Sequence, residues 1–135
     1  MAHSPRLTDT LVNNMADSGG ALFNNGYIRI YDGTQPATGG GAITSQVLLA
    51  ELRWNATAFS SASGGVLTPN AITGDSSANN SGTASWFRSL KSDGTTVLFD
   101  GSVGTSNADL IMASTTIVAG QAVNVTGGNI AVPKS

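Results

Sequence analysis

The stretch that decides the fold runs from Thr83 to Gly104 and reads TASWFRSLKSDGTTVLFDGSVG. Two runs of β-forming residues flank Ser92-Asp93-Gly94. An Asp-Gly pair accepts the positive φ of a tight turn, so the stretch predicts a β-hairpin. Trp86 and Phe87 are adjacent in the first run and therefore point to opposite faces of the strand. A large aromatic on each face indicates that both faces are covered, one by the core and one by something else.

Composition limits the classes of protein that the chain can belong to. Its 135 residues are the length of one domain. Charged residues make up 10% of the chain, the net charge is −2 and no basic cluster is present, which argues against nucleic-acid binding. The chain has no cysteine, and its apolar runs are too short to span a membrane. The expected surface is neutral and rich in Ser and Thr. Such a surface loses little solvation free energy when another protein covers it.

A short helix is predicted near the N-terminus. Leu7, Leu11 and Met15 recur every four residues and share one helical face. Thr8 is placed to cap the helix, and Gly19-Gly20 is expected to end the segment. We therefore divide the chain into an N-terminal arm, residues 1–7, and a single β domain, residues 8–135, with the helix at about 8–17.

A second hairpin signal precedes the first, at residues 21–32. Its turn is predicted at Asn25-Gly26, and Ile28 and Ile30 then alternate with polar and aromatic residues. The outward residues of this strand have the composition of an interface anchor, or of a platform on which a sugar stacks; a solvated strand face is the simpler interpretation. Together with two adjacent residues of the first hairpin, which point to opposite faces of their strand, they form the candidate interface: Tyr27, Arg29, Tyr31, Phe87 and Arg88.

The rest of the chain reads as loops and short strands. Residues 47–54 are predicted to form a strand, with a short helix as the alternative, and residues 59–72 a hairpin that turns at Gly64-Gly65. Further short strands are expected at 110–112 and 115–118, and a final strand pair places Val123 and Val125 before Gly127-Gly128 and Ile130 and Val132 after it. This pattern predicts a mainly β fold, an antiparallel β-sandwich (jelly-roll-like) with one short N-terminal helix. The expected core is Ile28, Ile30, Leu52, Trp86, Val97, Phe99, Val103, Ile117, Val123 and Val125.

No complete catalytic or metal-binding pattern is present in the sequence. Gly74-Asp75-Ser76 is similar to a nucleophile motif, but the single histidine, His3, is remote from it in the sequence, and a serine needs a positioned base. The residues around Asp75 have the spacing of a calcium loop, yet Asn80 and Trp86 stand where Gly and Glu are required. We therefore expect no enzyme activity, no catalytic residue, no cofactor and no metal.

Several runs resemble segments of small virion proteins of tailed bacteriophages. These runs are IRIYDGTQP at 28–36, TASWFR at 83–88, DGSVGTS at 100–106, and STTIVAG at 114–120 followed by VNV at 123–125. The resemblance covers most of the chain and rests on turns and strand faces. It implies a capsid decoration (cement) protein that binds the major capsid protein, lies on the capsid exterior and is made in the host cytoplasm. A tail, baseplate or fibre component is the nearest alternative.

Assembly is the last expectation. The low charge predicts that part of the surface is buried by other protein chains. We expect a homotrimer, with a dimer as the alternative, and an arm at residues 1–6 that straps onto the shell or a neighbour. No nucleic-acid or membrane partner is expected. A carbohydrate-binding β-sandwich module, with exposed tyrosines or tryptophans as platforms, is the alternative from another class.

Overall fold

The computed structural model describes residues 6–128, 130 and 131. Most of the expected arm, residues 1–7, therefore lies outside the described residues, as does Val132 of the final predicted strand pair. Helix α1 (Asp9–Ala21) comes first, and the Thr8 side chain accepts a hydrogen bond from the Leu11 amide, so the predicted N-cap is confirmed. The helix continues through Gly19-Gly20 to Ala21 and does not stop at the glycines, which corrects its expected end.

The face of α1 that packs against the rest of the chain is not the Leu7-Leu11-Met15 face seen in the sequence. Val12, Ala16 and Gly20 are buried, whereas Leu11 and Met15 point to solvent. The reason lies in the close approach of β3 (Val66–Leu67), because a Cβ on Gly20 would come within 3.2 Å of Leu67. The small residues of the helix let it lie near the sheet, and this packing outweighs the hydrophobicity of the larger residues.

Asn25-Gly26 joins the helix to the first strand and does not form a hairpin. Asn25 has a φ of 58°, and the Gly26 amide donates to the Phe23 carbonyl at 2.8 Å. The preceding residues belong to the helix and its final turn, so no strand precedes β1 (Tyr27–Tyr31). The turn at Asn25-Gly26 was predicted correctly, but the strand predicted before it is wrong, because the helix precedes the turn.

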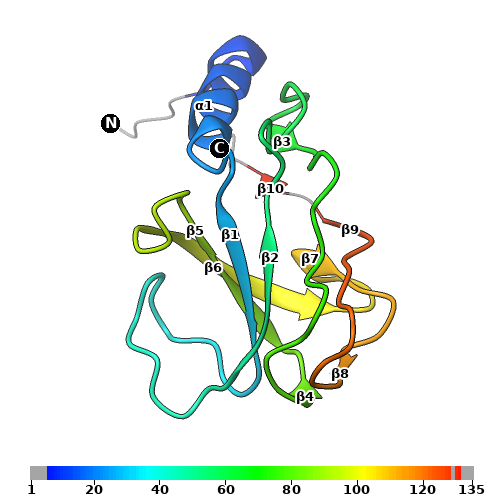
Figure 1. Cartoon of the computed structure of the whole chain (residues 1–135). Helices are drawn as coiled ribbons and strands as arrows, with labels where there is room; N and C mark the ends of the chain where they lie inside the picture. Colours follow the sequence, from blue (N-terminus) through cyan, green and yellow to red (C-terminus); the bar gives the residue numbers. More distant parts are fainter. Residues whose placement is uncertain (1–5, 129, 132–135) are drawn as a thin grey trace.

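The central sheet has six strands in the order β2-β1-β5-β6-β7-β9 (Figure 1). Beside β1 it contains β2 (Leu48–Arg53), β5 (Trp86–Leu90), β6 (Val97–Gly104), β7 (Leu110–Ile111) and β9 (Gly127–Gly128). The β5–β6 hairpin predicted from Thr83–Gly104 is confirmed, and Gly94 in its turn has a φ of 72°. The pairs are antiparallel except β6–β7, which is parallel. The fold is mainly β with one N-terminal helix, as predicted, and its sheet is mixed and curled.

A β-bulge interrupts the pairing of β1 with β2. Ile30 lies opposite Ala50, but Tyr31 lies opposite Leu48, so Leu49 is an additional residue on β2. The bulge turns both Leu49 and Ala50 into the core, where strict alternation predicts only one of them. The predicted strand at 47–54 is confirmed over the alternative of a helix.

The outer edge of β2 is covered by an irregular segment of the chain. The Arg53 amide donates to the Thr73 carbonyl at 3.0 Å, and the Thr73 amide donates back at 2.9 Å. The Glu51 amide donates to the Asp75 carboxylate at 2.9 Å. Asp75 then exchanges two backbone hydrogen bonds with Val123, whose own segment continues into β9. Hydrogen bonds therefore link the β2 edge to the far side of the curled sheet.

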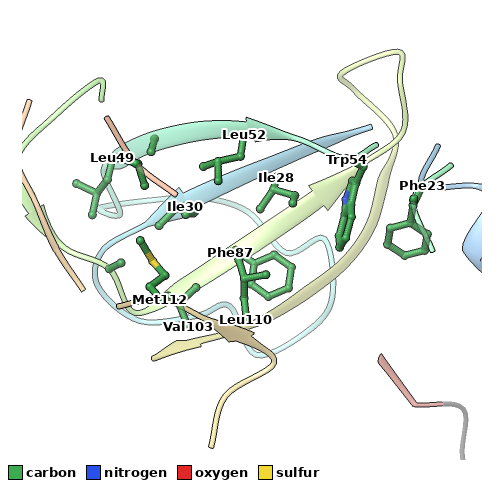
Figure 2. Close-up of a cluster of buried hydrophobic side chains, with 14 of the residues drawn as sticks. Phe23, Ile28, Ile30, Leu49, Leu52, Trp54, Phe87, Val103, Leu110 and Met112 are labelled. Carbon is green, nitrogen blue, oxygen red and sulfur yellow. The ribbon is translucent and has the colours of Figure 1, made fainter. Parts of the chain in front are cut away.

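Two small pairs complete the fold: β3 with β10 (Ile130–Ala131), and β4 (Gly82–Thr83) with β8 (Thr116–Ile117). The predicted turn at Gly64-Gly65 is confirmed, since both glycines have positive φ and the flanking residues pair. The core lies inside the curled sheet (Figure 2). Of the ten predicted core residues, seven are buried and three are partly buried: Val97, Phe99 and Val125.

Candidate functional site

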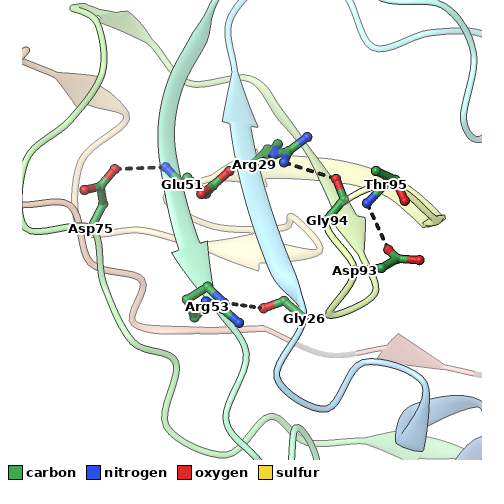
Figure 3. Close-up of polar contacts among 8 residues, drawn as sticks. All are labelled: Gly26, Arg29, Glu51, Arg53, Asp75, Asp93, Gly94 and Thr95. Carbon is green, nitrogen blue, oxygen red and sulfur yellow. Dashed lines mark hydrogen bonds and ion pairs between the residues drawn. The ribbon is translucent and has the colours of Figure 1, made fainter.

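The outward face of β1 and β2 carries the first part of the candidate interface (Figure 3). Arg29 lies opposite Glu51 in the register of the two strands, and its Nε donates to the Glu51 carboxylate at 2.8 Å. Its Nη2 donates to the carbonyl of Gly94, in the turn of the β5–β6 hairpin, at 3.2 Å. The side chains of the ion pair keep 29% and 35% of their exposure. Arg29 is thus half-exposed, but its guanidinium is already engaged within the chain.

Arg53, which the sequence did not single out, shares this face with Tyr27. Its guanidinium carbon lies 3.9 Å from the centre of the Tyr27 ring, a cation–π arrangement. Arg53 also donates to the carbonyls of Asn25, at 2.7 Å, and Gly26, at 3.3 Å. Tyr27 is therefore half-buried, and the arginine occupies one face of its ring, which a sugar would otherwise use. Strand alternation predicts that Arg53 faces outward, but its contact with Tyr27 depends on the pairing of two distant strands.

Tyr31 is buried, which corrects the expectation of an exposed Tyr-Arg-Tyr stripe. Its ring stacks on Trp86 with the centroids 4.7 Å apart and the planes 15° from parallel. Trp86 in turn donates its indole N–H to the Asp32 carbonyl at 3.0 Å. Burial raises the pKa of the Tyr31 hydroxyl, because the charged phenolate would lose its solvation.

Phe87 and Arg88 are also buried, on opposite faces of β5. Phe87 points into the core, where it meets Phe99 edge to face. Arg88 points the other way and forms a bidentate ion pair with Asp100, from Nε at 2.8 Å and from Nη2 at 3.0 Å. The side chains of this pair are 8% and 1% exposed. The hydrogen bond to Asp100 is the main cause of the raised pKa of Arg88.

The second face of the hairpin is covered by the chain's own loop, residues 32–47, which we call the covering loop. Arg88 donates to the Gly41 carbonyl at 2.7 Å, and the Gly40 amide donates to Asp100 at 3.1 Å. At the base of the loop, the Val47 amide donates to the Asp32 carboxylate at 2.6 Å. The prediction that both hairpin faces are covered is confirmed, and the cover is intramolecular. Tyr31, Phe87 and Arg88 therefore present little surface to a partner.

The exposed large hydrophobic residues lie elsewhere. Leu11, Met15 and Leu22 in and beside α1 are 46%, 48% and 49% exposed. The remaining ones in the described part of the chain lie in loops: Ile43, Val47 and Val118. The sequence pattern placed Leu11 and Met15 on one helical face and outside the expected core, but it did not predict that this face is exposed. The four-residue spacing of Val12, Ala16 and Gly20 was the signal in the sequence that could have identified the buried helix face.

Among the residues that the structure describes, those considered for catalysis and metal binding form no catalytic or metal site. Both Asp75 carboxylate oxygens accept backbone amides, from Glu51 at 2.9 Å and Ser77 at 3.0 Å, so the side chain stabilises a turn. Among the described residues, no group of three or more His, Cys, Asp and Glu residues could hold a metal. His3 lies outside them. Surface hollows of about 180, 270 and 300 Å³ contain one acidic side chain, Asp17, in their linings.

Comparison with known proteins identifies no relative: no family model, no curated protein and no solved structure matches this chain. No helix in the described part of the chain is long and apolar enough to cross a membrane.

Proposed function

We propose that the chain is a non-enzymatic structural protein of a tailed-bacteriophage virion, and that it decorates the exterior of the assembled capsid. Its partner in this role is the major capsid protein, and it is made in the host cytoplasm. The sequence runs that resemble small virion proteins, given above, support the choice of this class.

The observation that carries the proposal is the kind of surface that the described residues present. The aromatic side chains suited to ligand stacking are covered wholly or in part: Trp54, Trp86 and Tyr31 are buried, and Arg53 lies over one face of the half-buried Tyr27. What is exposed is neutral, rich in hydroxyl groups, and apolar along α1. Such a surface suits contact with another protein over a broad area more than capture of a small molecule.

The covering loop adds a second element to this proposal. A loop with three consecutive glycines, Gly39 to Gly41, would lose much conformational entropy if a partner had to order it. Here the Arg88–Asp100 pair already holds Gly40 and Gly41. A surface that is ordered before binding loses less entropy on binding, which strengthens association without additional contacts.

A decoration protein acts mechanically. It buries surface across the joints between capsomers, and the composite site exists only where those capsomers are assembled. Binding to the assembled state alone stabilises that state by mass action, so the shell resists internal pressure better when the protein is bound.

The carbohydrate-binding alternative is less well supported, because a stacking platform needs two or three exposed ring faces, whereas Tyr31 and both tryptophans are buried and Arg53 occupies one face of Tyr27. A tail or baseplate component would use the same kind of surface. Its position on the particle, and not its fold, separates it from a decoration protein.

The experiment is quantitative mass spectrometry of purified virions, followed by rebinding of the protein to capsids from which it has been removed. A decoration protein is expected in a fixed, high copy number relative to the major capsid protein, and its rebinding should raise the temperature at which capsids open. A few copies located at the tail would support the tail alternative. Absence from purified virions would reject the proposal.

A further inference from the structure

Four dipeptides of this chain can close a succinimide, a five-membered ring that alters the backbone. Asparagine or aspartate followed by glycine closes this ring most easily, because glycine has no side chain to hinder it. The chain has one Asn-Gly pair, Asn25-Gly26, and three Asp-Gly pairs: Asp32-Gly33, Asp93-Gly94 and Asp100-Gly101. The fold holds the reacting atoms of these pairs in two different ways.

Ring closure at Asn25 needs no reactant other than water. Hydroxide removes the Gly26 amide proton, the Gly26 nitrogen attacks Asn25 Cγ, and the Cγ–Nδ2 bond breaks. The departing nitrogen takes a proton from water and leaves as ammonia. Water then opens the ring at either carbonyl, which gives aspartate or isoaspartate. At an Asp-Gly pair the same attack expels water from the protonated carboxyl group, because an ionised carboxylate is a poor electrophile.

At the three Asp-Gly pairs the fold engages the carboxylate, the group that the backbone nitrogen would attack. The Thr96 hydroxyl donates to the Asp93 carboxylate at 2.6 Å, and the Thr96 and Thr95 amides each donate to it at 2.9 Å. These hydrogen bonds favour the charged form and hold the pKa of Asp93 well below its ordinary value. The carboxylates of Asp32 and Asp100 also accept hydrogen bonds, as described above.

At Asn25-Gly26 the fold engages the attacking nitrogen instead. The Gly26 amide donates to the Phe23 carbonyl at 2.8 Å, and Gly26 is buried. It has no room to shift, since a Cβ placed on it would collide with the Leu90 carbonyl oxygen. Asn25 is exposed, and within the described residues its side-chain amide has no hydrogen-bond partner. The group to be attacked is therefore open to water, and only the nitrogen is restrained.

The rest of the Asn25-Gly26 backbone is held as firmly. The Asn25 amide donates to the Asn55 carbonyl at 3.0 Å, and the Gly26 carbonyl accepts the Trp54 amide at 2.9 Å. Arg53 donates to both carbonyls, at 2.7 Å for Asn25 and 3.3 Å for Gly26 (Figure 3). All four backbone polar groups of the dipeptide are thus hydrogen-bonded, and Arg53 contributes a side chain that mutation can remove without altering the backbone.

We propose that Asn25-Gly26 is a deamidation site that the fold keeps closed, and that Arg53 is the side-chain clamp on it. Deamidation then proceeds only from molecules in which the junction between α1 and β1 has opened, so its rate is limited by that local opening. Isoaspartate adds a carbon atom to the backbone at a point where every polar group is bonded. The product cannot restore these bonds, so a transient opening becomes permanent.

Peptide mapping by mass spectrometry tests the protection. The full chain is incubated at mildly alkaline pH, either folded or unfolded in urea, and deamidation at Asn25 and isomerisation at Asp93 are followed over time. The rate at Asn25 should be lower in the folded chain by at least about tenfold, because the reaction must wait for the opening. Equal rates at Asn25 in the folded and unfolded chains would overturn the proposal.

Arg53→Met removes the clamp, and Arg29→Met is its matched control. Arg29 lies on the same outward face and also donates to a backbone carbonyl, but it bonds neither Asn25 nor Gly26. Arg53→Met should raise the folded-state rate at Asn25 several-fold and leave the rate at Asp93 unchanged, whereas Arg29→Met should not raise the rate at Asn25.

Three outcomes would reject the clamp: no acceleration by Arg53→Met, equal acceleration at Asn25 by both variants, or a joint rise at Asn25 and Asp93, which indicates global unfolding. Urea unfolding of both variants gives the global stability for this comparison. The inference does not rest on the proposed function, and absence of the protein from virions would leave it unchanged.

Discussion

The buried ion pair beneath the covering loop gives the sharpest prediction, because the same sheet carries an exposed pair for comparison. The Arg88 and Asp100 side chains are 8% and 1% exposed. Asp100→Asn removes the negative charge and leaves the buried Arg88 guanidinium without a counter-charge. Breaking a buried pair in this way costs about 3–5 kcal/mol of unfolding free energy. Glu51→Gln breaks the exposed pair with Arg29, 29% and 35% exposed, and should cost about 0.2–1 kcal/mol.

The assay is urea unfolding followed by tryptophan fluorescence, with the slope of the transition compared between variants. Added salt should reduce the cost of Glu51→Gln and leave that of Asp100→Asn nearly unchanged, because buried charges are screened little. Amide hydrogen exchange at Gly40 should accelerate in Asp100→Asn, since its amide donates to that carboxylate. A double variant, Arg88→Met with Asp100→Leu, should recover most of the lost stability. Equal costs for Asp100→Asn and Glu51→Gln would refute the reasoning.

Three further predictions concern single side chains. Burial raises the pKa of Tyr31, so the folded state favours the neutral phenol. This contribution to stability should be complete below the ordinary tyrosine pKa of about 10 and be lost as the pH rises through the higher folded value, and ultraviolet titration should show that Tyr31→Phe removes a transition above the ordinary value. Gly26→Ala should unfold at a lower temperature than the wild-type protein, because the added Cβ would collide with the Leu90 carbonyl oxygen. Gly19→Ala should instead be more stable by up to about 1 kcal/mol, because its added Cβ meets nothing. Calorimetry that ranks the two variants in the opposite order would contradict the packing. Trp86→Ala should cost about 3–5 kcal/mol in urea unfolding, and a cost under about 1 kcal/mol would show that the ring is not enclosed.

Elements defined by neighbouring residues could be predicted from the sequence. The Asp93-Gly94 turn, the Gly64-Gly65 turn, the Thr8 cap and the buried Ile28 and Ile30 all depend on propensities within a few residues. Each is specified before the chain folds, which explains why the sequence pattern was sufficient for them.

Elements defined by distant residues could not be predicted. Alternation along β1 assigns Tyr31 to the outside, but Trp86 and the covering loop enclose it from another part of the chain. The pairing of Arg88 with Asp100 requires the register of β5 and β6, and the contact of Arg53 with Tyr27 requires that of β1 and β2. Most of the candidate interface was misassigned for this reason: its outward residues were chosen by strand periodicity, which carries no information about loops that fold back.

The covered edge of β2 has a consequence for how the protein behaves when it is crowded. An open edge strand exposes a row of amides and carbonyls onto which another chain's strand can add, and proteins commonly prevent this with charged residues. Only 10% of the residues of this chain are charged, so electrostatic repulsion between neighbouring copies is weak. Thr73 and Asp75 occupy the β2 groups that an incoming strand would use. The protein can therefore accumulate to high local density without strand-by-strand polymerisation, and variants that detach residues 73–75 should be the ones that form fibres.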